Sequence, residues 1–123
     1  MNDHKKKFSL TKSEIIRSSN DISSIFETGR FVRGYFFDLI WAGKSRRQAA
    51  FAVSKQIRTA VARNRIKRRL REAYRLEKSG FQEKLRLILI GHEKVLQAPF
   101  DDLRQEMRMM ATKTKGKTMG KAP

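Results

Sequence analysis

One segment, residues 60 to 75, limits the possible folds more than any other, because it combines an apolar face with dense positive charge. Its sequence is AVARNRIKRRLREAYR. Apolar residues recur there three or four positions apart, which is the spacing of one face of an α-helix. We therefore predict a helix from Thr59 to about Glu77 that packs on a core through this face. The apolar face consists of Ala62, Ile66, Leu70 and Ala73.

The other side of the same helix is basic, with six arginines and one lysine in sixteen positions. Like charges four residues apart, such as Lys67 and Arg71, repel by roughly a few tenths of a kcal/mol per pair in the free protein. Phosphates more than offset this repulsion, because arginine grips them bidentately and each neutralised phosphate releases counterions. An ordinary solvated face is the alternative, but such faces mix both signs of charge. The residues expected to contact a polyanion are Arg63, Asn64, Arg65, Lys67, Arg68, Arg71 and Arg75.

The composition of the whole chain favours a nucleic-acid partner. Its 123 residues include 29 Lys and Arg against 12 Asp and Glu, a formal net charge of +17. A chain of this length is expected to form one domain, and it lacks the long apolar span that a membrane partner would require. The absence of cysteine excludes disulfides, thiolate nucleophiles and Cys-ligated zinc, and fits a reducing cytoplasm. The opening MNDHKKKFSL has no apolar run of signal-peptide length, so we expect a chain that is not exported.

Two segments are predicted before the first strand. Residues 1–18 are polar and basic, and they predict an extended N-terminal arm that packs loosely. A short helix is predicted from about Asn20 to Thr28, because Ser19 or Asn20 can cap its free N–H groups. Gly29 is expected to end this helix in a left-handed conformation.

The remaining segments alternate between strands and helices. The aromatic run from about Arg33 to Trp41 predicts a strand and QAAFAVSK predicts a returning strand, so residues 33–54 are expected to form a β-hairpin. LRLILI, residues 85–90, predicts a strand buried on both faces. Pro99 begins the last helix, and residues 112–123 predict a disordered basic tail. This order of elements predicts an α+β fold, a small sheet with helices packed on it.

The run FAVSKQIRTAVARNRIKRRLREAYR, residues 51 to 75, resembles the defining region of the protein subunit of bacterial ribonuclease P. That family has a strand ending in a V-S-K type sequence, a short connection, and then A-V-x-R-N-R-x-K-R-x-x-R-E on a helix. The resemblance covers about residues 20 to 110, so we assign a ribonuclease P protein-like domain to residues 19–111. The matching residues are Val53, Ser54, Lys55, Ala60, Val61, Arg63, Asn64, Arg65, Lys67, Arg68, Arg71 and Glu72.

The resemblance implies both a fold and a function. The implied fold is a four-stranded sheet with three helices, a two-layer α/β sandwich whose left-handed crossover departs from the general rule. The implied function is that of a small basic protein that forms a heterodimeric ribonucleoprotein with one catalytic RNA and promotes endonucleolytic removal of the 5′ leader from precursor tRNA. The RNA is expected to carry the catalysis, with Mg²⁺ held mainly by RNA oxygens, while the protein alone is inactive. The arginine-rich helix and Lys55 would face the catalytic RNA.

The resemblance also implies a cleft for the single-stranded leader, between the first helix and the sheet. The aromatic positions of the family correspond to Ile22, Phe26 and Ile40, of which only Phe26 is aromatic. We expect Phe36, placed on the same strand face as Ile40, to supply the missing stacking surface. In the turn before the arginine-rich helix, the family has a lysine and, two residues later, a glycine. This chain has Gln56 and Arg58 at these positions.

No group of residues predicts catalysis by the protein itself. His4 and His92 are expected on the surface, and Asp101 and Asp102 suit the first turn of a helix. Asp38 lies inside an apolar strand, where we expect it to hydrogen-bond within the hairpin; a cleft role in binding metal or repelling phosphate is the alternative. We assign no catalytic residue and no metal site on the protein. A ribosomal protein that binds structural rRNA is the second functional candidate, and co-sedimentation with ribosomal subunits would distinguish it.

Overall fold

The computed structural model describes residues 9–43 and 46–115, which form a four-stranded mixed sheet and three helices. The predicted α+β fold is confirmed. The strands, in the spatial order β1-β2-β4-β3, are β1 (Arg30–Val32), β2 (Phe37–Gly43), β4 (Leu85–Gly91) and β3 (Gln48–Val53). The helices are α2 (Ser19–Thr28), α3 (Ala60–Glu77) and α4 (Phe100–Lys115), and three short 3-10 turns are η1 (Lys12–Glu14), η2 (Lys78–Gly80) and η3 (Glu93–Gln97).

Strand β4 occupies the centre of the sheet, antiparallel to β2 on one side and parallel to β3 on the other. The predicted hairpin is therefore wrong, because β2 and β3 are not paired with each other but are separated by β4. The reason is that β4 is apolar on both faces, and only a central strand buries both faces and pairs both edges. The parallel strands β3 and β4 are joined through α3, which forms the crossover that the resemblance implied. The left-handedness of this crossover stays a prediction.

The aromatic run after Gly29 forms two strands, where the sequence predicted one strand from Arg33 to Trp41. Strand β1 pairs with β2 in antiparallel register, and residues 33–36 connect them. These residues do not continue the hydrogen bonding between β1 and β2. The carboxylate of Glu106 accepts hydrogen bonds from the backbone N–H groups of Phe36 and Phe37 instead, at 3.1 and 3.3 Å. A side chain from α4 thus replaces a strand as the partner of these groups.

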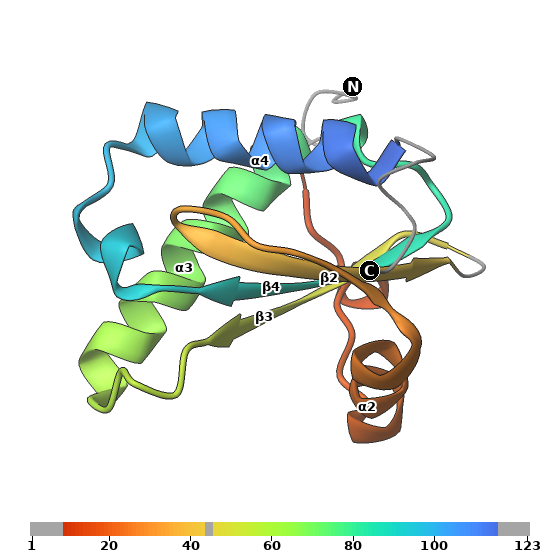
Figure 1. Cartoon of the computed structure of the whole chain (residues 1–123), viewed down its shortest axis with the longest axis horizontal. Helices are drawn as coiled ribbons and strands as arrows, with labels where there is room; N and C mark the ends of the chain where they lie inside the picture. Colours follow the sequence, from red (N-terminus) through yellow and green to blue (C-terminus); the bar gives the residue numbers. More distant parts are fainter. Residues whose placement is uncertain (1–8, 44–45, 116–123) are drawn as a thin grey trace.

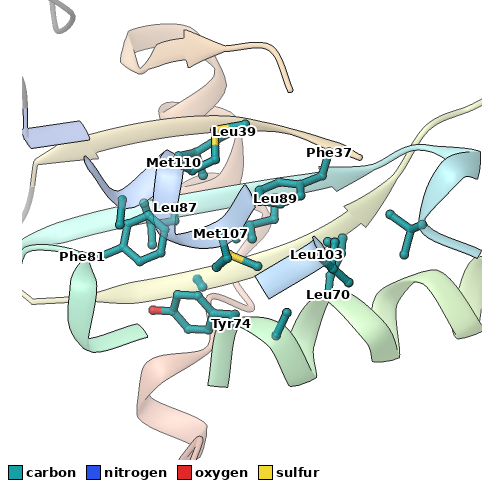
Figure 2. Packing of buried hydrophobic residues seen from close by; sticks show 14 of the residues in the cluster. Phe37, Leu39, Leu70, Tyr74, Phe81, Leu87, Leu89, Leu103, Met107 and Met110 are labelled. Atoms are coloured by element: carbon teal, nitrogen blue, oxygen red, sulfur yellow. The ribbon is translucent and has the colours of Figure 1, made fainter. Parts of the chain in front are cut away.

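Helices lie on both faces of the sheet (Figure 1). Helices α3 and α4 enclose the larger core on one face, and Figure 2 shows Leu87 and Leu89 of β4 among its residues. Ile88 points to the other face, where it packs with Ile25 of α2 in a smaller cluster. Helix α2 therefore adds a partial layer to the sandwich. The larger core includes Phe37, Leu39, Ile66, Leu70, Tyr74, Leu103, Met107 and Met110.

The helix boundaries follow the sequence closely at α3 and less closely at α2. The side chain of Thr59 accepts a hydrogen bond from the N–H of Ala62 and caps α3 as expected. Helix α2 begins one residue earlier than predicted, because Ser18 is its N-cap. Gly29 is in an extended conformation, φ −78° and ψ 169°, so the left-handed stop is wrong. Glycine is needed for space, since a Cβ there would lie 2.8 Å from Ile40 Cγ2.

The N-terminal segment packs firmly where the structure describes it, so the loosely packed arm is wrong for residues 9–18. Ile16 is buried, and its N–H donates to the carbonyl of Ala49 at 2.9 Å, which places the segment along the outer edge of β3. The buried ammonium of Lys78 pairs with Glu14 at 2.6 Å and donates to the carbonyl of Ser9. Residues 1–8 lie outside the described residues.

At the other end of the chain, α4 continues beyond the expected end of the domain at residue 111. Residues 112–115, predicted as the start of a disordered tail, are helical. The reason is that the buried face of α4 continues through Thr114, whose hydroxyl donates to the carbonyl of Ala111. Residues 116–123 lie outside the described residues.

Candidate RNA interface

The outer side of α3 carries cations that the protein itself does not neutralise. Arg65, Lys67, Arg68 and Arg71 are exposed, and within residues 9–43 and 46–115 none of them has an ion pair or a side-chain hydrogen bond. Asn64 is exposed beside them. The opposite face buries Ile66, Leu70 and Ala73, as predicted. The helix is therefore held by its apolar face, while its free guanidinium and ammonium groups remain available to phosphate oxygens.

Arg63 differs from these residues because its guanidinium is turned toward the protein. Its Nη1 donates to the carbonyls of Ser54 and Ile57 at 3.2 and 2.8 Å. These bonds hold the turn between β3 and α3, which presents the exposed Lys55. Arg58 is accommodated where the family has glycine, because none of the described residues, this turn included, has a positive φ.

Two further arginines of α3 also have partners in the protein. Arg75 forms an ion pair with Glu72 one turn earlier, and the hydrogen bond from Arg75 lowers the pKa of Glu72. Arg69 donates to the carbonyl of Ala98 and lies 6.0 Å from the ring of Phe100, so it ties α3 to the start of α4. Only part of the positive charge on α3 is thus free for a ligand.

The expected leader cleft lies on the face of the sheet that α2 covers. Ile40 is buried there, Ile22 is half-buried, and the ring of Phe26 is 51% exposed. Phe36 is not on this face, because it belongs to the connection before β2 and packs against the larger core; its predicted placement is wrong. Phe31 takes that place, since it pairs directly with Ile40 across β1 and β2 and is 47% exposed.

Sequence reasoning missed Phe31 because the strand was predicted to begin at Arg33. The available signal was the tripeptide RFV directly after Gly29, which forms β1. Phe31 and Phe26 together give this face two exposed aromatic rings. Exposed rings of this kind are suited to stacking with unpaired bases.

The surface of α3 and the face under α2 meet at one hollow. This hollow, about 230 Å³ in volume, is lined by Ile22 of α2, Ala50 and Phe51 of β3, and the cations Lys67 and Arg71. Segments far apart in the chain thus bring two of the predicted phosphate ligands next to a predicted cleft residue. The arrangement lets one strand of RNA contact cations and apolar surface in succession.

A second and larger hollow lies at the end of the sheet where β3 and β4 both terminate. Its volume is about 460 Å³, and Asp38 and His92 line it with Tyr35. Asp38 Oδ1 lies 2.9 Å from His92 Nε2 and accepts from the N–H of Gly34 at 3.1 Å. Asp38 therefore has one partner within residues 33–54, Gly34, as expected, and one outside them, His92. His92 is thus a half-buried partner of a carboxylate, not a simple surface residue.

No group of three or more His, Cys, Asp or Glu side chains among the described residues is placed to hold a metal ion. No helix among them is long and apolar enough to cross a membrane.

The family model described as Ribonuclease P matches residues 10–115 of the chain. The chain belongs to the ribonuclease P protein family. A relative named ribonuclease P protein component, from Chlorobium phaeobacteroides, is 36% identical over 122 residues, covering 80% of this chain and 83% of the relative. A second protein of that name, from Dictyoglomus thermophilum, is 34% identical over 85 residues, covering 68% of this chain and 71% of the relative.

Solved structures agree with the fold. The ribonuclease P protein from Thermotoga maritima superposes with a TM-score of 0.71 at 20% identity, covering 84% of this chain and 99% of the other. The ribonuclease P protein of Staphylococcus aureus superposes with a TM-score of 0.68 at 22% identity, covering 85% and 96%. The resemblance stated from the sequence is confirmed. Family membership implies a part in ribonuclease P and tRNA processing, with an RNA partner in a ribonucleoprotein.

Proposed function

We propose that the chain is the protein subunit of ribonuclease P, that it binds the catalytic RNA through α3, and that it binds the 5′ leader of precursor tRNA beside α2. The observation that carries the proposal is the set of exposed cations on α3, without partners among the described residues, in a member of this family. Phosphates next to such a surface relieve its like-charge repulsion and release their own counterions. The exposed cations of α3 are Arg65, Lys67, Arg68 and Arg71.

In this proposal the RNA performs the hydrolysis, with Mg²⁺ held mainly by RNA oxygens, and the protein reduces the electrostatic cost of bringing RNA strands together. Each phosphate that a cation neutralises removes repulsion between the catalytic RNA and the substrate. The complex would be a heterodimer of one protein and one RNA that acts in the cytoplasm. The protein therefore lowers the Mg²⁺ concentration that processing requires.

The leader is assigned to the two exposed rings on the α2 side of the sheet. Phe26 and Phe31 offer flat apolar surface, and the cations Lys67 and Arg71 line the adjacent hollow. Stacking of this type accepts any base, because every base has an apolar face. It suits a substrate class whose leaders differ in sequence.

Reconstitution with a cognate catalytic RNA tests the proposal directly. The expected result is cleavage of precursor tRNA at lower Mg²⁺ with the protein than without it, and no cleavage by protein free of RNA. The double variant Lys67→Ala, Arg71→Ala should abolish most of this effect, while Lys84→Ala, an exposed cation outside α3, should not. Equal Mg²⁺ requirements with and without the wild-type protein would contradict the proposal.

The leader assignment has its own test. Phe26→Ala should reduce the preference for precursor over mature tRNA by a factor equivalent to at most roughly 1–3 kcal/mol, because one stacking surface is lost. Phe26 is 51% exposed, so the melting temperature should change little. A large fall in melting temperature with an unchanged preference would show instead that the ring serves the core.

A further inference from the structure

The 460 Å³ hollow at the end of the sheet is built from three connections. Tyr35 and Arg33 come from the connection between β1 and β2, Gln56 from the turn after β3, and His92 and Lys94 from the segment after β4. Asp38 forms part of its wall from the second residue of β2. Because β3 and β4 are parallel, their carboxyl ends bring the last two of these segments to the same edge.

The rim of the hollow offers an aromatic ring and two cations. The ring of Tyr35 is 62% exposed, and Lys94 Nζ lies 3.9 Å from its centroid. Arg33 and Lys94 are exposed, and neither forms an ion pair with a described residue. Arg33 also lies 6.0 Å from the ring of Phe31. A ring beside cations that have no ion pair can stack with a base while the cations hold its phosphate.

The wall of the hollow offers hydrogen-bond acceptors in a fixed orientation. Asp38 Oδ1 is occupied by His92 Nε2 and by the N–H of Gly34. Oδ2 has no hydrogen-bond partner among the described residues, and it is not among their enclosed polar atoms. When a neutral His92 donates through Nε2, its Nδ1 is an acceptor. The wall is therefore suited to a ligand that presents N–H donors.

We propose that this hollow binds one unpaired RNA nucleotide, with its base on Tyr35, its phosphate near Arg33 and Lys94, and an amino group of the base donating to Asp38. The mixture of charges favours this occupant over simpler ones. A bare anion would be repelled by Asp38 and Glu93, and a metal ion would be repelled by the two cations. A nucleotide has an anionic end and a donor edge, so it matches both.

The site is expected to select against uracil. Adenine, cytosine and guanine each carry an exocyclic amino group, whereas uracil has a carbonyl oxygen where cytosine has its amino group. The one donor on that edge of uracil, N3–H, lies between two carbonyl oxygens, so a carboxylate that accepts from it also lies close to a carbonyl oxygen, which opposes binding. The inference deepens the proposed function, on which it rests for RNA being the ligand.

Two mononucleotides of equal size test the selection on the full-length protein alone. Cytidine 5′-monophosphate and uridine 5′-monophosphate differ at position 4 of the base, by an amino group against an oxygen. Titrations followed by amide NMR signals of Tyr35, Asp38 and His92 should show cytidine binding about tenfold more tightly, as expected for one hydrogen bond to a charged acceptor. Equal affinities, or no shift of these signals with either nucleotide, would overturn the proposal.

Variants separate recognition from mere structural support. Asp38→Asn should bring the two affinities close together, because an amide can donate to the uracil oxygen. Tyr35→Ala should weaken both nucleotides and leave their ratio unchanged, while Lys84→Ala should change neither. Retention of the full cytidine preference in Asp38→Asn would count against the carboxylate as the reader of the base. If Asp38→Asn fails to fold, the ratio of the two affinities in the wild type and the effect of Tyr35→Ala still test the proposal.

Longer RNAs then identify the source of the nucleotide. If the nucleotide comes from the leader, a precursor tRNA whose leader consists of cytidines should bind more tightly than one whose leader consists of uridines. Asp38→Asn should remove this difference. If it comes from the catalytic RNA, the leaders should bind equally and Asp38→Asn should weaken binding of the catalytic RNA. The mononucleotide titrations contain no catalytic RNA, so they test the nucleotide site independently of the proposed function. The nucleotide site can therefore be supported when reconstitution fails, and it can be refuted when reconstitution succeeds.

Discussion

Tyr74 carries a buried hydroxyl that has no hydrogen-bond partner among the described residues. Its ring is well packed, 5.7 Å from the ring of Phe51 and 5.8 Å from that of Phe81, and Figure 2 shows it among the residues of the larger core. Burial raises the pKa of this phenol far above its ordinary value, so the hydroxyl stays protonated. The ring therefore stabilises the core while the hydroxyl opposes it.

Tyr74→Phe should make the protein more stable. The variant keeps the ring and removes an unsatisfied polar group, whose burial costs about 1–3 kcal/mol. Urea unfolding should show a higher midpoint with an unchanged slope. A lower midpoint would mean that the hydroxyl has a partner, such as an enclosed water molecule.

Glu106 is a second residue whose surroundings oppose its ionisation. Burial raises the pKa of Glu106 above its ordinary value of 4.5, although the backbone N–H groups of Phe36 and Phe37 act in the opposite direction. Between the ordinary and the raised value, the folded protein binds more protons than the unfolded chain. The contribution of Glu106 to stability therefore falls as the pH rises through this interval.

Glu106→Gln should separate this effect from the loss of a contact. Glutamine stays neutral at every pH and keeps one acceptor oxygen for the backbone. The free energy of unfolding of the variant, relative to wild type, should rise as the pH increases from about 4 to 7. Denaturation at several pH values measures it, and a constant or falling difference would contradict the raised pKa.

At the scale of elements, α3 carries two kinds of cation: some are paired within the protein, and others are exposed without a partner among the described residues. Arg68→Ala should flatten the slope of log affinity for the catalytic RNA against log salt by up to about one unit, because a free cation is removed. Arg75→Ala should change the slope less, since Arg75 is paired with Glu72. Filter binding over a range of salt measures both, and identical slopes for Arg68→Ala and wild type would exclude Arg68 from the interface.

The elements that the sequence predicted well have local signals. A few neighbouring residues determine each of three such features: the cap at Thr59, the apolar run of β4 and the start of α4 after Pro99. The division of the aromatic run into β1 and β2 is not local, because it depends on Glu106, seventy residues away from Phe36. The free cations of α3 could be predicted as a group, because the helical period places them on one side of the helix. The inward turn of Arg63 could not, because it depends on how the preceding turn places the carbonyls of Ser54 and Ile57.

At the scale of the whole molecule, the N-terminal segment and the hollow at the end of the sheet depend on contacts between distant parts of the chain. Lys78 reaches Glu14 across sixty-four positions, and His92 reaches Asp38 across fifty-four. Composition and periodicity contain no information on such pairs. The family resemblance gave the number of strands and helices, but not these contacts.

Ile16→Ala tests whether the N-terminal segment is part of the folded domain. Ile16 is 5% exposed, so the variant should lose about 2–5 kcal/mol of unfolding free energy through the cavity it creates. Ile15→Ala, at a half-buried neighbour, should cost less. Thermal or urea unfolding measures both, and a negligible loss for Ile16→Ala would restore the view of a loosely packed arm.

The central place of β4 has a consequence during protein synthesis. β4 is the last strand to leave the ribosome, yet both β2 and β3 pair with it. Translation from the end of β2 to the end of β4, at about 5–20 residues per second, takes several seconds, during which these two strands have no partner on that side. Unpaired strand edges associate with other chains, so a nascent chain arrested before Gly91 should be prone to aggregate, and release of β4 should end that exposure.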